Sequence, residues 1–377
     1  MRCATNALVR RARLRYAPVM SLIASLLLLS AQATPLPEAL PSEIHNFDDW
    51  VVTCDNGLRC EAVSLVPANP PAPEEGAASE ADPWDRFGVL KLARGPEADA
   101  PLVITLSDFD GVPARLDHYA NTLDVTLVAQ DEEGSWRVDA ADRNALLERF
   151  FSGSLVVRDA SGRALTEISV DGAWGAMVYM DERQGRLRTP TALLRRGTRP
   201  VSSIPAPPPV PVVNVAPRTG DKPLTISERR MNEARRQFGC TLEEVGVISQ
   251  DVSTHALGNG RTLILMGCGA GAYNFSSLPL IAWREGNATR IEPAAFDVAR
   301  EIFEGEEEPP GYFVINAEFD PATMTISEWS KGRGLGDCGK AAGYAWDGSR
   351  FRLVRQAEMS ECRGTYELLT TWRTETR

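Results

Sequence analysis

The stretch Trp346-Asp347-Gly348-Ser349-Arg350-Phe351-Arg352-Leu353 is the clearest fold signal in this chain. An Asp-Gly pair supplies the positive φ angles of a tight turn, and the apolar residues on both sides suit the two strands of a β-hairpin. Asn259-Gly260 repeats this signal between His255 and Thr262. Both stretches predict antiparallel β-structure.

Short runs typical of β-strands continue outward from this hairpin along the whole chain. They occupy residues 50–53, 61–65, 102–106, 123–129, 155–158, 244–249, 262–267, 278–283, 312–319, 323–329, 343–346, 350–355 and 366–373. Two short helices are predicted between them, one within residues 139–151 and one from Thr225 or Ser227 to Phe238, where Gly239 ends it. We expect a mainly β (α+β) protein with two antiparallel β-rich domains and a few short helices.

A proline-rich segment, residues 199–223, divides the chain in two. Its centre is Pro205-Ala206-Pro207-Pro208-Pro209-Val210-Pro211, where proline fixes φ and removes amide donors. We interpret it as a semi-rigid linker between an N-terminal domain (34–198) and a C-terminal disulfide-bonded domain (224–377). Residues 67–83 and the acidic run 304–308 are too polar to bury, so we expect a disordered loop and a solvated loop there.

The first 33 residues have the three-part layout of a secretory signal peptide. An apolar run at 19–29, too short to span a bilayer, precedes the small-residue site Ala31-Gln32-Ala33. Five arginines lie before the run: Arg2, Arg10, Arg11, Arg13 and Arg15. Because the flanking twin-arginine consensus is incomplete, we expect the general secretory route, cleavage near Ala33 and a periplasmic or secreted bacterial protein.

The charge balance of the mature chain argues against polyanionic partners. Removing the five signal arginines leaves 35 basic and 51 acidic side chains, a formal charge of −16. Such a field repels phosphate backbones, so nucleic acid is excluded as a partner. No second apolar stretch approaches the ~20 residues of a membrane helix, and we expect no transmembrane segment in the mature chain.

Six cysteines remain after cleavage, an even number that suits full pairing in an oxidising compartment. They are Cys54, Cys60, Cys240, Cys268, Cys338 and Cys362. Cys54 and Cys60 flank a short Asn-Gly turn, which predicts a disulfide between them. Three pairings exist for the other four. Chain proximity favours Cys240 with Cys268 and Cys338 with Cys362.

No catalytic, metal-binding or cofactor-binding set is recognisable. His45, His118 and His255 lie in none of the sequence settings of a serine triad or a histidine metal centre, and we expect surface or loop positions for them. Asp108 and Asp110 precede a glycine and predict a turn that ends a strand. The glycine-rich residues 267–272 lack the lysine and the helix of a phosphate-binding loop.

Several of these pieces together resemble the exported bacterial proteins grouped as domain of unknown function 1176. The resembling stretches are Phe47 to Asn56 with Cys60, Cys268 to Asn274, and Cys338-Gly339 with Trp346-Asp347-Gly348, Cys362-Arg363-Gly364 and Trp372. This resemblance implies export and the architecture, and it assigns no activity. The first domain is also similar in style to invasion-associated locus B proteins, through its Trp50, Cys54 and Cys60 start and residues 165–179.

Together these features favour a non-enzymatic, exported envelope protein that binds a protein or an envelope component. A carboxylate-dependent hydrolase of cell-envelope polymers is one alternative, because catalysis by residues such as Asp108, Asp110 or Asp337 leaves no short motif. An inhibitor of a cationic enzyme is another. Its binding would follow from the charge of −16 and would weaken with salt.

Overall fold

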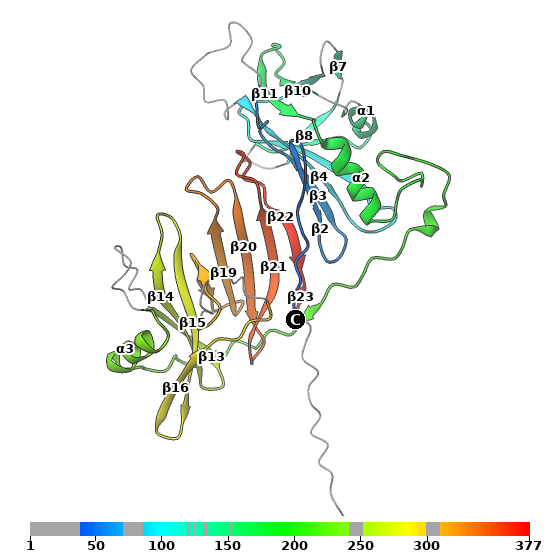
Figure 1. Cartoon of the computed structure of the whole chain (residues 1–377). Helices are drawn as coiled ribbons and strands as arrows, with labels where there is room; N and C mark the ends of the chain where they lie inside the picture. Colours follow the sequence, from blue (N-terminus) through cyan, green and yellow to red (C-terminus); the bar gives the residue numbers. More distant parts are fainter. Residues whose placement is uncertain are drawn as a thin grey trace, which may run out of the picture. The chain divides into compact units, whose positions relative to one another are not determined.

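Antiparallel β-sheets are the main secondary structure of the protein, a computed structural model (Figure 1). It describes residues 38–70, 86–118, 121–123, 125–130, 134–148, 150, 153–240, 252–298 and 310–377. Three α-helices lie in these ranges: α1 (Arg143–Leu147), α2 (Ala173–Arg183) and α3 (Glu228–Gln237). The predicted fold class, mainly β with antiparallel sheets and few short helices, is confirmed.

Two sheets and α2 form the N-terminal half, residues 45–198. The seven-stranded sheet has the order β1 (His45–Phe47), β2 (Trp50–Cys54), β3 (Cys60–Ser64), β4 (Val89–Arg94), β5 (Leu102–Ser107), β9 (Trp136–Val138) and β8 (Leu127–Ala129). The four-stranded sheet has the order β11 (Ala164–Ser169), β10 (Ser154–Arg158), β6 (Arg115–His118) and β7 (Asn121–Leu123). Residues of both sheets and of α2 share one apolar core.

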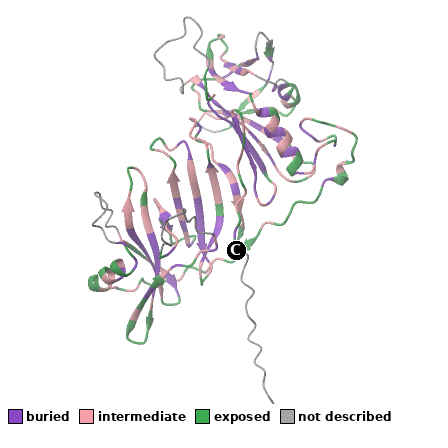
Figure 2. Cartoon of the chain, in the orientation of Figure 1, coloured by how far each residue is buried: buried purple, intermediate pink, exposed green. Residues whose placement is uncertain are grey.

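Strand β2 is buried along its whole length because both of its faces are covered. Successive side chains of a strand point to opposite faces. Trp50, Val52 and Cys54 belong to the core beneath α2, whereas Val51 packs against residues of the C-terminal half. Figure 2 shows the resulting continuous burial of the strands in the middle of the seven-stranded sheet.

Two stacked sheets form the C-terminal half, residues 224–377. The first contains β13 (Val252–Gly258), β14 (Arg261–Ala270), β15 (Phe275–Glu285) and β16 (Ala288–Pro293), and β17 (Val314–Ile315) pairs with β15. The second contains β18 (Glu318–Asp320), β19 (Thr325–Lys331), β20 (Gly339–Trp346), β21 (Phe351–Met359) and β22 (Leu369–Arg373). An apolar core that includes Leu263, Ile281, Tyr344 and Phe351 lies between them.

Helix α3 covers the other face of the β13–β16 sheet. Ser227 caps its first turn by accepting a hydrogen bond from the backbone N–H of Arg230, and Gly239 follows its end at φ 72°. Ala234 and Phe238 pack there against Ile264 and Met266. The predicted helix and both of its end signals are confirmed.

The two halves share a further apolar cluster. Val51, Val63, Leu65 and Val89 of the seven-stranded sheet pack against Cys338, Met359 and Leu369 of the C-terminal half. Polar contacts accompany this cluster: Lys91 pairs with Glu367 at 3.0 Å, and Arg363 donates to the carbonyl oxygen of Val66 at 2.8 Å. The described residues of each half therefore contribute to burying the other.

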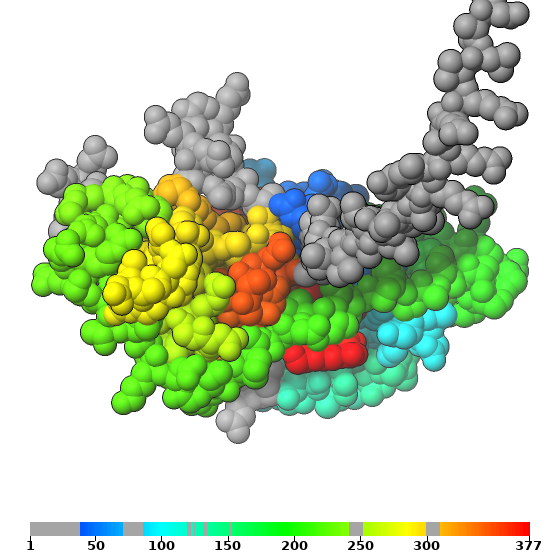
Figure 3. Space-filling model, turned by 90° about the horizontal axis from the view of Figure 1, so that it is seen from below, coloured from blue at the N-terminus to red at the C-terminus, as the bar shows by residue number. Residues whose placement is uncertain are grey.

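The proline-rich segment 199–223 pairs with the carboxyl-terminal residues of the chain through Val212 and Val213. There β12 (Val212–Val213) pairs in parallel with β23 (Glu375–Thr376), as Figure 3 shows where the red carboxyl-terminal residues lie beside green ones. Val213 is buried, whereas residues 205–209 are exposed. The linker interpretation and the two-domain boundaries stay predictions.

Both predicted hairpins are present, but only Asn259-Gly260 is a two-residue turn; the loop after Trp346 has four residues, with a positive φ at Gly348. Asn259 and Gly260 have φ of 50° and 70° and join β13 to β14. In the turn between β20 and β21, the Asp347 carboxylate accepts from the backbone N–H groups of Ser349 and Arg350, both at 2.8 Å. The predicted signal peptide 1–33, most of the loop 67–83, the strand 244–249 and the acidic run 304–308 lie outside the described residues. None of the helices among the described residues is long and apolar enough to cross a membrane.

Candidate functional site

A cavity of about 720 Å³ opens where the β18–β22 sheet extends beyond the apolar core. Its volume lies within the range of roughly 300–1,000 Å³ that ligand sites occupy. Its lining comes from three places: a segment that we call the strap (residues 38–44), the adjacent ends of β19, β20 and β21, and two residues from connecting segments, Val298 and Tyr312.

Backbone hydrogen bonds hold the strap along this cavity. The N–H of Ala39 donates to the Asp297 carbonyl at 2.8 Å, and the N–H of Ser42 donates to the Thr371 carbonyl at 3.0 Å. Asp297 is itself fixed, since its carboxylate accepts from the Leu353 N–H at 2.7 Å and pairs with Arg352. One wall of the cavity is therefore an extended segment anchored at both ends.

The floor of the cavity is a polar continuation of the core face of the β18–β22 sheet. Cross-strand register places Ser330 opposite Lys340, Lys340 opposite Glu358, and Ala342 opposite Gln356. Because side chains alternate along a strand, Lys340 points to the same face as Tyr344 and Trp346, which lie in the apolar core. Along this face the strands change from aromatic to hydrogen-bonding side chains.

Hydrogen bonds join Tyr312, which lines the cavity, to Tyr344 of the apolar core. The hydroxyl of Tyr344 donates to the buried carboxylate of Glu328 at 2.8 Å and lies 2.7 Å from the Tyr312 hydroxyl. Burial first, and then the charge of Glu328, raise the pKa of Tyr344, so the phenol stays protonated and remains a donor. Phe296 stacks on Tyr312 at a centroid distance of 4.6 Å.

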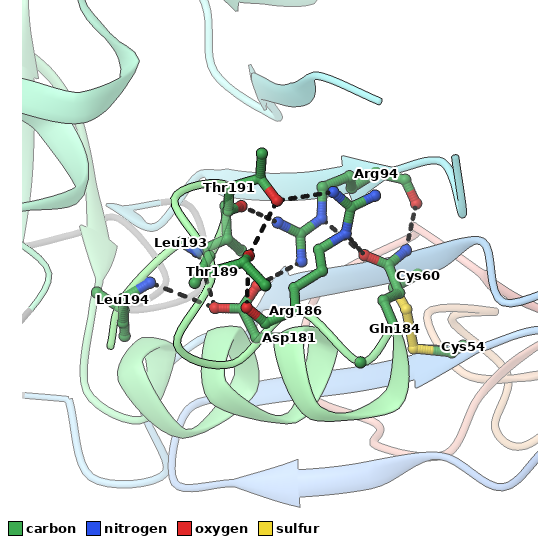
Figure 4. Close-up of polar contacts among 12 residues, drawn as sticks. Cys54, Cys60, Arg94, Asp181, Gln184, Arg186, Thr189, Thr191, Leu193 and Leu194 are labelled. Carbon is green, nitrogen blue, oxygen red and sulfur yellow. Dashed lines mark hydrogen bonds and ion pairs between the residues drawn. A yellow bond between two sulfur atoms is a disulfide. The ribbon is translucent and has the colours of Figure 1, made fainter. Parts of the chain in front are cut away.

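A second polar cluster, around Arg94 and Arg186 in the N-terminal half, has the character of a structural clamp. Arg94 pairs with the fully buried carboxylate of Asp181 at 2.6 Å, and Gln184 accepts from Arg94 and Arg186 at 2.8 and 3.0 Å (Figure 4). The other Asp181 oxygen accepts from the Leu193 N–H at 2.8 Å. These groups satisfy one another and fix the segment after α2 to β4.

Electrostatics agree with this structural role. Burial, followed by the charge of Arg94, lowers the pKa of Arg186 to about 10. Even that value leaves the guanidinium protonated at neutral pH. A smaller cavity of about 450 Å³ lies beside the cluster and includes Arg59, Glu97 and Asp99 in its lining.

The carboxylates singled out from the sequence line neither of these two cavities. Asp108 and Asp110 follow β5 in the predicted turn, with Asp108 at φ 60°. Loss of hydration, and second the nearby carboxylate of Glu367, raise the pKa of Asp108. The structure therefore places Asp108 near a second carboxylate, Glu367, that the sequence analysis did not consider.

Asp337 is a structural residue. Its buried carboxylate accepts from Arg333 Nε at 2.7 Å and from the Gly364 N–H at 2.8 Å. Burial opposes its ionisation, but the hydrogen bonds from Arg333 and Gly364 outweigh burial and lower its pKa. A carboxylate held in its charged form by an arginine is poorly suited to be a general acid.

The expectation of surface or loop histidines is wrong for His118, which is buried on β6. Its sheet position, opposite Leu155 of β10, places it on a covered face. His45 lies half-buried on β1 against Tyr179, and His255 lies on β13 against Phe319. Burial lowers the pKa of His255. The three histidines lie on three separate sheets.

Three disulfides join Cys54 to Cys60, Cys240 to Cys268 and Cys338 to Cys362. The first closes the turn between β2 and β3, the second ties the end of α3 to β14, and the third lies at the cluster shared by the halves. Among the described residues, no group of three or more His, Cys, Asp or Glu side chains could hold a metal ion.

Sequence reasoning missed every polar residue on the cavity floor. A usable signal exists in Gln356 and Glu358, two polar residues in alternate positions just beyond the predicted strand 350–355, which the structure extends to Met359. This alternation indicates that one face of the strand becomes polar, but it does not reveal which segment of the chain faces it. The strap is more than 250 positions away in the sequence, and only the folded chain brings it to β19, β20 and β21.

Comparisons with known proteins agree with the resemblance seen in the sequence. The family model described as "Protein of unknown function (DUF1176)" matches residues 44–377. The chain is 30% identical over 352 residues to "Uncharacterized protein YpfG" of Escherichia coli (strain K12), an alignment that covers 87% of this chain and 91% of that protein. No solved structure matches the chain.

Proposed function

This chain belongs to the DUF1176 family of proteins of unknown function, and from that premise we propose that it is an exported, non-enzymatic envelope protein that binds a partner in the cavity bounded by the strap. The main support is the change of chemistry along one sheet face. Where the core ends, the strands present Ser330, Lys340, Gln356 and Glu358 to an open volume instead of closing it with apolar side chains.

Export accounts for the disulfides. Three intrachain disulfides are typical of a protein outside the cytosol. We propose a periplasmic or secreted location after cleavage near Ala33, because residues 1–33 have the layout of a signal peptide. Amino-terminal sequencing of exported protein should begin at or near Thr34. Exported material that still begins at Met1 would contradict this route.

Binding without turnover is the better interpretation of the cavity, for two reasons. Lys340 stands directly opposite Glu358, so the cross-strand neighbour of this carboxylate is a cation and not a second carboxylate. The aspartates suggested by the sequence lie outside the lining. A carboxylate-dependent hydrolase is the second candidate, because the lining contains two carboxylates, Glu43 and Glu358. Inhibition of a cationic enzyme stays a prediction from charge alone.

A cavity-filling variant tests the proposed site. The ligand preparation is a soluble muramidase digest of peptidoglycan, and binding to the purified exported chain is measured by calorimetry. Ser330→Trp places a large side chain on the cavity floor and should abolish binding, whereas Ser202→Trp, at an exposed position, should leave it unchanged. Thermal melts of both variants establish that they are folded.

The same samples separate binding from catalysis. We expect the digest to be recovered with an unchanged product profile after incubation with the protein. New products that disappear with Glu358→Gln would establish the hydrolase instead. Binding that survives Ser330→Trp in folded protein, or no binding by the unmodified chain, would contradict the proposed function.

A further inference from the structure

The charges on the cavity lining cancel. The lining contains two cations, Lys331 and Lys340, and two carboxylates, Glu43 and Glu358. Their formal sum is zero in a mature chain whose total charge is −16. The site therefore does not share the strong negative charge of the molecule, and net charge does not attract a ligand to it.

Charges on the floor already have partners. Lys340 of β20 and Glu358 of β21 stand directly opposite each other, where β-carbons lie roughly 5 Å apart. Neither side chain is without an interaction. A ligand with a full charge would have to displace the interaction that each of these side chains already makes, and a partly buried charge left without compensation is costly.

The uncharged groups on the lining suit hydroxyls and amides. The side-chain amide of Gln356 offers hydrogen-bond donors and an acceptor. Each hydroxyl of Ser330 and Ser360 can also donate and accept a hydrogen bond. Lys340 can donate to a neutral oxygen, and Glu358 can accept from a neutral O–H or N–H, while the two stay together. A neutral polyhydroxyl ligand can therefore use every polar group here.

The rest of the lining is apolar. Ala39, Ile44 and Val298 contribute aliphatic surface, and the ring of Tyr312 is held by its stacking on Phe296. A pyranose ring has a C–H face that packs on such surface and an edge of hydroxyls, so one ligand matches both parts of the lining. A cavity of about 720 Å³ is large enough for more than one sugar ring.

We propose that this cavity binds a neutral, N-acetylated saccharide segment, recognised by its hydroxyl and acetamido groups. The inference rests on the proposed function, since it specifies the ligand class of the same cavity. A peptide with charged ends is the competing class. It is disfavoured because its ammonium and carboxylate groups would each have to compete with the interactions that Glu358 and Lys340, opposite each other on neighbouring strands, already make.

Three small probes distinguish the classes by calorimetry with the purified exported chain: N,N′-diacetylchitobiose, its cationic unacetylated form, and the zwitterionic dipeptide Ala-Ala. We expect the acetylated disaccharide to bind at least about tenfold more tightly than the other two. Its affinity should be nearly independent of ionic strength, because no net charge is neutralised. Preference for the cationic or the zwitterionic probe would overturn the proposal.

Variants locate the binding. Gln356→Ala should lower the affinity for the acetylated disaccharide about tenfold, because hydrogen bonds are lost. The matched control Gln130→Ala, on the exposed surface of the N-terminal half, should leave the affinity unchanged. Lys340→Met should shift preference toward the cationic form, since Glu358 loses its counter-charge. The reciprocal exchange Lys340→Glu with Glu358→Lys keeps the floor neutral and should retain the original preference.

The outcomes separate this inference from the proposed function. Binding of the peptidoglycan digest together with failure of the acetylated disaccharide would overturn the saccharide class and leave the cavity's binding role intact. Failure of both the digest and the disaccharide would overturn both. Disaccharide binding that is unaffected by Gln356→Ala in folded protein would place the sugar elsewhere and contradict the inference.

Discussion

Arg373, near the end of the chain, pairs with Asp55, a fully buried carboxylate in the turn closed by the Cys54–Cys60 disulfide. The second Asp55 oxygen accepts from the backbone N–H groups of Gly57 at 2.8 Å and Arg59 at 2.9 Å. The Asn56 side chain bonds the backbone of Arg373 in both directions, at 3.0 and 2.9 Å. A turn near the beginning of the mature chain is therefore fixed to its last long strand.

Removing the arginine of this pair should destabilise the protein. Arg373→Gln leaves Asp55 with only its backbone donors, and we expect a loss of about 1–2 kcal/mol in the free energy of unfolding, because the partner is buried but the arginine is partly exposed. Urea unfolding measures it. The control Arg377→Gln removes an exposed pair with Glu375 and should change stability by less than about 0.5 kcal/mol. Equal effects of the two variants would contradict the role given to Asp55.

Cleavage of the proline-rich segment should leave the two halves associated. A protease site placed at the exposed residues 206–209 allows a single cut, and no disulfide crosses it. Val51, Val63, Met359 and Leu369 would stay packed together because separating the halves exposes this apolar cluster. Gel filtration of the cut protein should show one species of unchanged size. Two separate folded fragments would show that each predicted domain is independent.

Asp108→Asn should stabilise the protein at neutral pH. Although the side chain of Asp108 is exposed, partial loss of hydration and, second, the nearby Glu367 raise its pKa in the folded state, so ionisation of Asp108 opposes folding to a small extent. Asparagine has no ionisable carboxyl group, so the cost of ionisation in the folded state disappears. It also tolerates the left-handed φ of 60° at this position. The gain in melting temperature should be present at pH 7, fade as the pH falls through the raised pKa of the folded state, and be gone below the ordinary aspartate value of about 4. Asp110→Asn is the matched control and should have little effect. A lower melting temperature for Asp108→Asn at pH 7 would refute the argument.

Asp181→Asn should be among the most damaging single substitutions in the N-terminal half. It leaves the buried guanidinium of Arg94 without its carboxylate partner and removes the negative charge near the buried Arg186, at a cost of about 3–5 kcal/mol. Glu182→Gln, on the next residue of α2 and exposed, should be nearly neutral. Denaturant unfolding of the two variants provides the comparison. If Asp181→Asn lowers the free energy of unfolding only slightly, water replaces the carboxylate in the cluster and the role given to Asp181 is wrong.

Features that depend on neighbouring residues could be predicted from the amino-acid sequence. Asp347-Gly348 and Asn259-Gly260 form their turns because the positive φ angles and the side-chain acceptor are supplied within a few residues. Ser227 and Gly239 delimit α3 for the same reason. The antiparallel β class follows from these local signals and from the strand-like runs between them.

Which sheet faces are covered, and where the cavity lies, depends on contacts between distant segments of the folded chain. An alternating strand such as β2 does not reveal that α2 covers one face while Met359 and Leu369 cover the other. His118 is buried by the same kind of distant partner, and the cavity forms where the strap meets β20 and β21. These contacts join residues far apart in the sequence. Their free energy comes from burial and pairing across the fold, which no short window of sequence contains.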